Sequence, residues 1–449
     1  MFGLLLVAFA LRAYRLSYQE LRGDEAFGYF LSRYPYADIV TRTLALQEPH
    51  PVAAYFVSRA WMVWTGDSEF ALRFIGLCWS VLAVAFLYRL ACALRLSRAV
   101  AFLGAVLLAL SPYVIWHSQD ARMYNMSLAL TLASTWLAVE AMRRPRWRYW
   151  GAYVLVSLLA LHTHYFAAFI LVAQNVFFIG EALLCADRRR RIWQWLAAQL
   201  AIVLLYLPWL LAVRSILVGY RGNVDSPAPG IMVERILGVF AVGESSPVEA
   251  RALVAGICGA LMMLGLVRLL AGDARTRRAA VLLILYLAIP VLTTWLGSRS
   301  RPIFDERYLI AAAPACYLLL AAVISPVDSD RRAAFWQGLK ALGIAGLAFL
   351  LFGASVSLQR YYTDPSYSKS LGWRELAHVV DQLASGLPAD QVRVVQNFPD
   401  PTQWYYYRGP VDHVVLPPAA GDQPGTRREV RELADRGVRR VVLPLQPMP

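Results

Sequence analysis

Apolar segments long enough to cross a membrane recur along the first 357 residues, and short polar segments separate them. A helix needs roughly 20 predominantly apolar residues to span a bilayer, and the spacing predicts about eleven such helices. The expected fold class is therefore a polytopic α-helical membrane protein. The predicted spans are 1–16, 72–93, 99–116, 126–142, 149–162, 165–185, 193–213, 251–271, 280–297, 309–325 and 338–357.

The loop after the first span is unusually long and covers residues 17–70. It contains Ala37–Leu46 and Val52–Trp64, each long enough for a short helix. The aromatic residues of the second segment favour helices that lie in the membrane interface rather than across it. Residues 1–16 resemble a signal peptide, but they lack its basic start, so we expect a short first span.

The composition changes from about Leu358 onward, where no long apolar run remains. Short Val-rich segments predict strands at Val392–Val395, His413–Leu416 and Arg440–Leu443, and helices are expected between them at Trp373–Leu383 and Arg427–Asp435. We therefore expect two domains, a transmembrane domain at residues 1–357 and a small α/β domain at residues 358–449.

Composition supports a membrane protein, because 58% of the residues are hydrophobic and only 16% are charged. Soluble proteins carry about 25% charged residues. The net charge of +14 would suit nucleic acid, but the Arg residues cluster in short loops between apolar segments, as in membrane proteins. We expect the bilayer and phosphate groups as partners, and no nucleic acid. The five Cys show neither metal-ligand spacing nor a disulfide framework.

Charge asymmetry between the loops predicts the orientation of the chain. Short loops rich in Arg stay on the cytoplasmic side, and alternation puts five basic loops on the same side. The basic residues are Arg95, Arg98, Arg143, Arg144, Arg146, Arg148, Arg188–Arg191, Arg268, Arg275, Arg277, Arg278, Arg331, Arg332 and Lys340, and we expect them to act only as topology determinants. The loops expected outside are 17–70, 117–125, 162–164, 214–250 and 298–308. The same alternation makes the C-terminal domain extracytoplasmic.

The first candidate site is the acidic pair Asp24 and Glu25, which follows the first span and Gly23. Carboxylates beside a membrane need water, a cation or a proton. We predict catalytic carboxylates at the outer surface, with Asp24 as a general base. The structural alternative is a helix N-terminus, because Asp is a good N-cap residue.

The second candidate site is Glu48-Pro49-His50-Pro51, in which two prolines fix a stiff turn. Such a turn could aim Glu48 or His50 at a substrate or a metal ion. The alternative is an ordinary proline-rich loop.

The third candidate site is the loop 117–125, which carries Asp120, Arg122 and Tyr124. We predict Asp120 as a second catalytic acid and Arg122 as a phosphate ligand, because the planar guanidinium binds two oxygens at once. The alternative is a salt bridge between Asp120 and Arg122 that stabilises the turn.

Two further outer loops complete the candidate site. His162 and His164 interrupt an apolar stretch, where we expect a sharp turn. Candidate metal ligands are Glu48, His50 and His164, although spacing alone cannot establish a metal site. The loop 298–308 supplies Arg301, Arg307 and Tyr308, either as a clamp for a leaving phosphate or as an interfacial anchor.

The order of these motifs resembles polyprenyl-phosphate-sugar glycosyltransferases of the GT-C fold, which include protein O-mannosyltransferases and the lipid A aminoarabinose transferase. The resemblance covers about residues 10–325 and rests on the acidic pair, the Pro-rich turn, Ser118–Tyr124 and Arg307–Leu309. It implies that Asp24 is the catalytic acid of the first outer loop and that Asp120 matches the acidic residue of the next outer loop. Glu48–Pro51 matches the family's Pro-rich turn. Some members carry a basic residue and consecutive prolines at the turn, where this chain has Pro-His-Pro.

The resemblance implies an inverting glycosyltransferase that moves a sugar from a polyprenyl-phosphate donor to a hydroxyl of a lipid, glycan or protein acceptor. No cofactor is required beyond a possible divalent metal. A close alternative is an oligosaccharide-transferring enzyme of the same fold. A transporter or flippase would carry charges near the middle of its spans, whereas most charges here lie at span ends. A non-catalytic scaffold would use only the outer α/β domain.

Overall fold

The structure is a computed structural model that describes residues 1–144, 146–183, 188–222, 224–327, 333–370, 372–396, 400–415 and 422–443. Cys185, Arg331, Arg332 and Leu416, which the sequence analysis named, lie outside these ranges. The chain forms two compact units. The first comprises Met1–Leu16 and Tyr34–Tyr367, and the second comprises Ser17–Arg33 and Ser368–Pro449. Residues 17–33, which we expected in the transmembrane domain, thus belong to the second unit.

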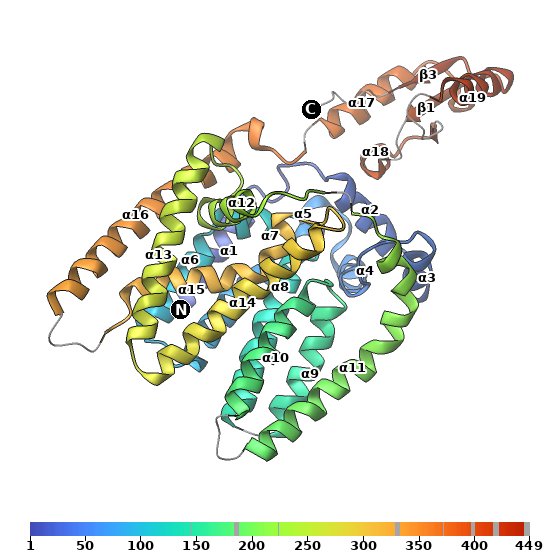
Figure 1. Ribbon diagram of the computed structural model, residues 1–449. Coiled ribbons are helices and arrows are strands. Elements are labelled where there is room, and N and C mark those ends of the chain that lie inside the picture. The colour runs from blue at the N-terminus through green and yellow to red at the C-terminus, as the bar shows by residue number, and fades with distance from the viewer. Residues whose placement is uncertain are drawn as a thin grey trace. The chain divides into compact units, whose positions relative to one another are not determined.

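The first unit is helical, and each predicted span coincides with a helical segment (Figure 1). The two helices predicted within the first loop are confirmed as α3 and α4. The helices are α1 (Phe2–Ala13), α3 (Tyr36–Ala45), α4 (Ala53–Thr65), α5 (Glu69–Ala93), α6 (Arg98–Leu110), α7 (Pro112–Ser118), α8 (Tyr124–Arg143), α9 (Trp147–Leu161), α10 (Ala167–Leu183), α11 (Arg188–Gly219), α12 (Pro229–Val242), α13 (Arg251–Ala271), α14 (Ala274–Ser298), α15 (Ala313–Ala321) and α16 (Ala333–Thr363). Short 3-10 helices are η1 (Val248–Ala250), η2 (Glu306–Ala312), η3 (Ala322–Ile324) and η5 (Pro365–Tyr367).

Helix α15 lies in the centre of the first unit, and all nine of its residues are buried. Helices α6, α13 and α14 pack around it. Helix α8 packs between α5 and α9, and buried hydrogen bonds link α8, α9 and α10. In this network Gln174 Nε2 donates to Ser134 Oγ and Thr135 Oγ1 at 3.1 and 2.8 Å, and Tyr153 OH donates to Gln174 Oε1 at 3.1 Å. Such polar contacts hold membrane helices together, because surrounding lipid removes the hydrophobic driving force for helix association.

The predicted number of eleven spans is not confirmed. Among the described residues, six helical segments are long and apolar enough to cross a membrane, or up to seven if α6 and α7 form one bent span. Helices α1, α9 and α10 have 12, 15 and 17 residues, which is shorter than a full span. Helix α8 has 20 residues but contains the buried Ser and Thr groups of the network.

A proline divides the predicted span 99–116. The residue before a proline avoids the helical conformation, and Ser111 is extended where α6 ends. Its hydroxyl then caps α7 by accepting from the Val114 N–H, with Pro112 at the first helical position. The two helices meet at a bend of 54°, so α7 leads into the predicted third site.

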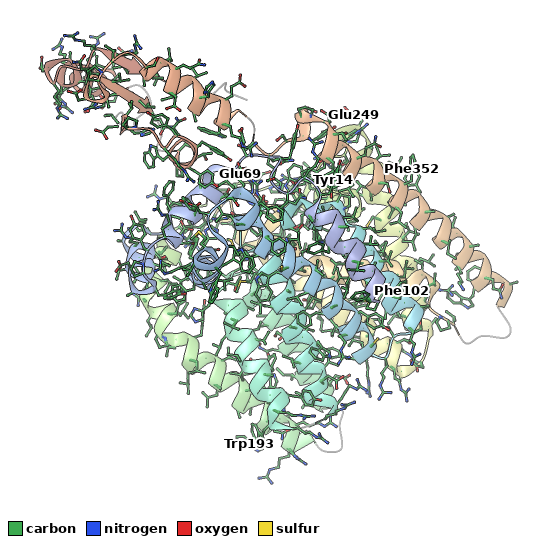
Figure 2. All side chains as sticks on the ribbon, turned by 180° about the vertical axis from the view of Figure 1, so that it is seen from behind. Tyr14, Glu69, Phe102, Trp193, Glu249 and Phe352 are labelled. Carbon is green, nitrogen blue, oxygen red and sulfur yellow. The ribbon has the colours of Figure 1, made fainter. Side chains whose placement is uncertain are left out.

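The outer surface of the first unit is apolar. Phe102 on α6 and Phe352 on α16 are 44% and 70% exposed, and Figure 2 shows both at the edge of the helical body. The figure places Tyr14, Glu69 and Glu249 at one end of this unit and Trp193, near the start of α11, at the other. Exposed apolar area of this extent fits a lipid-facing surface between two polar ends.

The second unit contains a parallel three-stranded sheet with strand order β2-β1-β3. The predicted strands and helices of this region are confirmed, except that Leu416 is outside the described residues and α18 was not predicted. The elements are α2 (Gly23–Ser32), α17 (Trp373–Ala384), η6 (Ala389–Gln391), β1 (Val392–Gln396), α18 (Pro401–Tyr406), β2 (Asp412–Val415), α19 (Gln423–Asp435) and β3 (Arg440–Val442).

Helix α2 and the residues before it belong to this unit through specific contacts. The Leu21 N–H donates to Tyr406 OH at 2.8 Å, and the rings of Tyr29 and Tyr405 are 5.0 Å apart. The Glu20 carboxylate accepts from the backbone N–H of Arg374 at 3.0 Å, at the start of α17. A carboxylate there satisfies free N–H groups and complements the helix dipole.

Candidate functional site

The loop between α3 and α4 forms a fixed acid–imidazole pair. The chain reverses at Gln47, whose φ is +53°, and two prolines then hold the turn. Glu48 Oε1 bonds His50 Nδ1 and accepts from Tyr55 OH on α4 at 3.1 Å. The side chains of Glu48 and His50 are largely buried. The pair is therefore a rigid unit rather than two independent groups.

His164, in the turn between α9 and α10, links three loops. Its ring stacks on His50 with centroids 6.3 Å apart. It also contacts Tyr124 at 5.9 Å and Tyr308 at 5.7 Å. The sharp turn predicted at this position is confirmed. Aromatic contacts thus gather the predicted polar loops around one imidazole.

Arg307 approaches the same aromatic group from the first turn of η2. Its guanidinium carbon lies 5.9 Å from the Tyr124 ring centroid and 5.4 Å from that of Tyr308. Its Nε lies 3.0 Å from Asp305 Oδ2. Ring faces attract guanidinium groups, so these contacts hold Arg307 toward the cluster.

Burial and the charges of Arg122 and Arg307 shift the pKa values of the acid and the imidazoles in this cluster. Burial lowers the pKa of His164 well below its ordinary value, and His50, Arg122 and Arg307 lower it further. Burial also lowers the pKa of His50, against its hydrogen bond with Glu48. Burial raises the pKa of Glu48, but the hydrogen bond from His50 and the nearby charges reverse this, and its pKa lies below the ordinary value. At neutral pH His50 and His164 are therefore neutral and Glu48 is ionised, beside the guanidinium groups of Arg122 and Arg307 and the Asp305 carboxylate that pairs with Arg307.

A cavity of about 160 Å³ opens beside the cluster. Both polar and apolar side chains form its walls. The lining residues are Pro49, His50, His164, Tyr165, Phe166, Leu217, Tyr220, Arg301, Ile303 and Tyr308. The combination suits a ligand with both a charged and an apolar part.

A second acid–imidazole group adjoins the cluster at the end of α7. His117 Nδ1 lies 3.3 Å from Asp120 Oδ2, and its Nε2 lies 3.1 Å from Glu244 Oε1. Asp120 is fully buried. The His117 ring contacts Tyr124 at 5.5 Å, which connects this group to the cluster. Asp120 therefore orients His117.

Not every predicted residue joins the cluster. The ring of His162 instead contacts Tyr206 and Trp209 on α11, at 4.9 and 5.8 Å. Arg301 lines the cavity but donates to the Leu217 carbonyl at 2.7 Å, so part of its guanidinium is already bound.

Asp24 and Glu25 lie in the first turn of α2, in the second unit. Glu25 is fully buried, and its Oε2 accepts from the backbone N–H of Arg22 at 3.0 Å. It closes a capping box in which Arg22 is the N-cap residue. The helix N-terminus expected as the structural alternative is present, but its cap is not Asp24. The Asp24 side chain is 31% exposed, with Oδ1 3.6 Å from Arg22 Nε. The role of Asp24 as a base stays a prediction.

The candidate metal ligands do not form a metal centre in the described part of the chain. No group of three or more His, Cys, Asp or Glu there is arranged to hold a metal ion. Glu48 and His50 bond each other, and His164 stacks on His50.

Two acidic residues escaped the sequence analysis. Glu244 follows Gly243 at the end of α12, and only the folded chain brings it to His117. Asp400 caps α18 by accepting from the Thr402 N–H at 2.9 Å, and its carboxylate lies 3.3 Å from where a Cβ on Gly23 would stand. The pair Asp400-Pro401 is a recognisable helix start and could have been found.

A protein-family comparison supports part of this assignment. The family described as dolichyl-phosphate-mannose-protein mannosyltransferase matches residues 48–211. The match begins at Glu48 and includes the loop of Asp120 and Arg122, but it covers less than half of the chain. No curated protein sequence matches the chain significantly.

Solved structures show the fold. ArnT from Cupriavidus metallidurans aligns over 97% of this chain and 87% of its own, with a TM-score of 0.60 and 11% identity. The oligosaccharyltransferase AglB from Archaeoglobus fulgidus aligns over 98% and 69%, with a TM-score of 0.60 and 12% identity. The arabinofuranosyltransferase AftD from Mycobacteria aligns over 88% and 29%, with a TM-score of 0.51 and 15% identity.

These similarities define the chain as an integral membrane protein with the GT-C glycosyltransferase fold. The fold expected from the sequence resemblance is confirmed. Fold alone does not determine activity, so the reaction has to be argued from the site.

Proposed function

We propose that the chain is an inverting glycosyltransferase that moves one sugar from a polyprenyl-phosphate donor to an acceptor hydroxyl at the extracytoplasmic membrane face. The observation that carries this proposal is the meeting of Arg122 and Arg307 with the Glu48–His50 pair beside a partly apolar cavity. One solved ArnT structure is bound to undecaprenyl phosphate, and the AglB structure contains a dolichol-phosphate.

The cluster has the charge that a lipid-linked phosphate requires. A phosphodiester is an anion, and guanidinium groups bind its oxygens in pairs. The leaving phosphate gains negative charge as its bond to the sugar breaks, so the two Arg residues stabilise the transition state more than the bound donor. The neutral His50 and His164 can add hydrogen bonds without competing for the same charge.

The apolar part of the cavity lining suits the isoprenoid chain. Phe166, Leu217 and Ile303 line the cavity next to the cationic cluster. Leu217 belongs to α11, whose apolar side chains are largely exposed along the helix. An isoprenoid can follow this surface while its phosphate remains at the polar end.

The reaction is a single displacement at the anomeric carbon. The acceptor oxygen forms a new bond to this carbon as the bond to the phosphate oxygen breaks, which inverts the configuration. The hydroxyl proton passes to Asp24, and the electron pair leaves with polyprenyl phosphate, held by Arg122 and Arg307. General-base assistance is typically worth about 10²–10⁴-fold. Asp120 acts through His117 as a positioning residue.

Transfer of a whole oligosaccharide is the second candidate function. The similarity to the oligosaccharyltransferase AglB, at a TM-score of 0.60, favours it as much as the ArnT alignment favours single-sugar transfer. The mass added to the acceptor distinguishes the two reactions.

The test is turnover in membranes that contain the native acceptors. Labelled undecaprenyl-phosphate sugars are supplied, and both transferred label and released undecaprenyl phosphate are measured. Asp24→Asn should lower turnover by about 10²–10⁴-fold at equal protein level. Asp38→Asn is the matched control, because Asp38 is an exposed acid in the first turn of α3.

Retained turnover in Asp24→Asn would reject Asp24 as the base. If the wild-type protein released no undecaprenyl phosphate from any labelled donor, the proposed reaction class would be wrong.

A further inference from the structure

A second cavity, of about 370 Å³, lies at the opposite end of the membrane helices from the candidate site. Helices α11 and α14 run from one cavity to the other. Arg191 and Arg278, near the starts of these helices, line the second cavity, while Leu217 and Arg301, at or beyond their ends, line the first. The 25 residues of α14 separate them by about 37 Å at 1.5 Å per residue.

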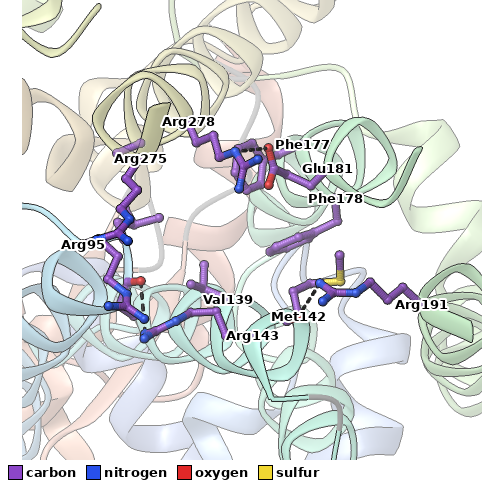
Figure 3. Close-up of a pocket in the computed structure, with 13 residues that line it drawn as sticks. Arg95, Val139, Met142, Arg143, Phe177, Phe178, Glu181, Arg191, Arg275 and Arg278 are labelled. Carbon is purple, nitrogen blue, oxygen red and sulfur yellow. Dashed lines mark hydrogen bonds and ion pairs between the residues drawn. The ribbon is translucent and has the colours of Figure 1, made fainter. Parts of the chain in front are cut away.

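Five arginines from separate parts of the chain converge on this cavity (Figure 3). They are Arg95, Arg143, Arg191, Arg275 and Arg278. Among the described residues, the acidic side chain in the lining is Glu181, whose Oε1 lies 3.5 Å from Arg278 Nε. Glu140, next to the lining, places its Oε1 2.9 Å from Arg143 Nη1. Two carboxylates cannot neutralise five guanidinium groups, so the described residues leave a positive surplus that an anion would relieve.

Backbone carbonyl groups hold two of these side chains in place. Arg143 Nη1 donates to the Ala93 carbonyl at 3.2 Å, and Arg191 Nη1 donates to the Met142 carbonyl at 2.7 Å. Arg191 Nε is buried and finds no hydrogen-bond partner in the described part of the chain. A buried donor without a partner is costly, and a bound anion would supply the missing acceptor.

The backbone conformation of Arg95 indicates that its side chain has a role in the cavity. The Leu96 N–H donates to the Ala91 carbonyl and the Arg95 N–H to the Cys92 carbonyl, both at 3.1 Å. This is the helix-ending arrangement that normally has Gly in the left-handed position. Arg95 occupies that position with φ of +63°. A non-glycine residue there costs free energy, which the guanidinium in the cavity can offset.

The start of α14 adds to the positive field. Arg275 lies in the first turn, where cations oppose the helix dipole. Asp273 caps this turn by accepting from the backbone N–H groups of Arg275 and Thr276 at 3.0 and 2.8 Å. Arg275 is therefore placed against its local preference, which makes sense if an anion binds beside it.

The floor of the cavity is apolar. Val139, Met142, Phe177 and Phe178 lie between the arginines (Figure 3). One end of each of the helices α5, α11 and α14 lies at this cavity. All three helices are long and apolar enough to cross a membrane. We propose that this pocket binds the phosphate headgroup of an anionic phospholipid, with its acyl chains along the adjoining helices. The arginine distribution places this pocket in the cytoplasmic leaflet.

Lipid retention tests this assignment. The full chain is incorporated into nanodiscs of phosphatidylcholine with a minor fraction of phosphatidylglycerol, and native mass spectrometry counts the lipids retained after gentle delipidation. The wild-type protein should retain phosphatidylglycerol in preference to phosphatidylcholine. Arg275→Gln and Arg95→Gly should each weaken that preference by about fivefold. Excess inorganic phosphate should not displace the lipid.

The variants separate binding from folding. Glycine suits the backbone at position 95, so Arg95→Gly should keep or raise thermal stability while it loses lipid. Arg277→Gln is the matched control, because Arg277 is exposed on the same helix and does not line the pocket. Equal retention of the two lipids, equal losses in Arg275→Gln and Arg277→Gln, or displacement by inorganic phosphate would each overturn the proposal.

Discussion

Individual side chains of the cationic cluster were predictable, but their partners were not. The sequence indicated Glu48, His50, Arg122 and Arg307 because charged and polar groups next to a membrane are costly unless they have a partner or a function. It gave no means of pairing Glu48 with His50. Such pairings depend on the three-dimensional path of the loops, which no spacing rule contains.

Glu244 illustrates the same limit. It lies in a predicted outer loop, 127 positions from its partner His117. A single acid after a glycine is too common a pattern to stand out in a sequence.

The imidazole of His164 should make stability depend on pH. Its pKa in the folded protein lies well below the ordinary value because of burial and nearby positive charge. As the pH falls below about 6.5, the unfolded chain takes up a proton that the folded chain refuses. The folded state is then destabilised by about 1.4 kcal/mol for each unit that separates the two pKa values. The contribution of neutral His164 to the free energy of unfolding is complete above about pH 6.5. It is lost as the pH falls toward the pKa of His164 in the folded protein.

Thermal unfolding of the detergent-solubilised protein at pH 7.5 and 5.5 measures this effect. His164→Asn, which cannot titrate in this range, should lose less stability on acidification than the wild type. An identical loss in both proteins would mean that His164 is not the responsible group.

Glu25 should matter for stability and Asp24 for turnover. Glu25→Ala removes the acceptor for the Arg22 N–H and should cost about 0.5–2 kcal/mol, as loss of a helix cap does. Glu25→Gln keeps an acceptor oxygen and should retain most of the stability. Chemical denaturation would show the difference, and equal stabilities of the two variants would contradict the capping role.

Secondary-structure elements were predicted more successfully than single contacts. Apolar runs marked the helices of the first unit, and short Val-rich segments marked β1, β2 and β3. The misses have local causes. Ser111 and Pro112 break a predicted span into α6 and α7, and α18 has only six residues, too few for a periodic pattern. The number of eleven spans is not confirmed, because several of the helices at the predicted positions are shorter than a full span.

The position of Glu244 depends on the turn that ends α12. Gly243 has φ of +82°, and a Cβ there would stand 2.7 Å from the Cβ of Pro112 on α7. Gly243→Ala should therefore destabilise the first unit by about 1–3 kcal/mol through backbone strain and overpacking. Thermal unfolding measures the loss.

A glycine in an open position supplies the control for this substitution. Gly256 lies within α13, and a Cβ there meets nothing within 4 Å. Gly256→Ala should be neutral or stabilising, since alanine is the better helix former. If the two variants had the same stability, the close approach of α12 and α7 would not be a structural requirement.

At the scale of the whole molecule, loop sidedness was the most useful prediction. Alternation assigned the loops of Glu48, Arg122, His164 and Arg307 to one side, and the structure brings these four side chains together. The opposite ends of the helices gather the arginines of the second cavity. This result does not depend on the exact number of spans, because each of these loops follows a helix that was correctly located.

The sequence could not predict that residues 17–33 belong to the second unit. This segment lies early in the chain, yet it packs with residues after 368 through contacts such as that of Leu21 with Tyr406. Hydrophobic periodicity describes neighbours in sequence and carries no information about a partner 385 positions away.

The central claim is that Arg122 and Arg307 form the phosphate site of a lipid-linked donor. The most direct test is binding of undecaprenyl phosphate to the purified full chain, measured by native mass spectrometry. Loss of a charge-assisted hydrogen bond costs about 1.5–3 kcal/mol, so Arg122→Gln and Arg307→Gln should each weaken binding at least about tenfold. Arg299→Gln, at an exposed position just after α14, should bind like the wild type. Unchanged binding in both cluster variants would contradict the account.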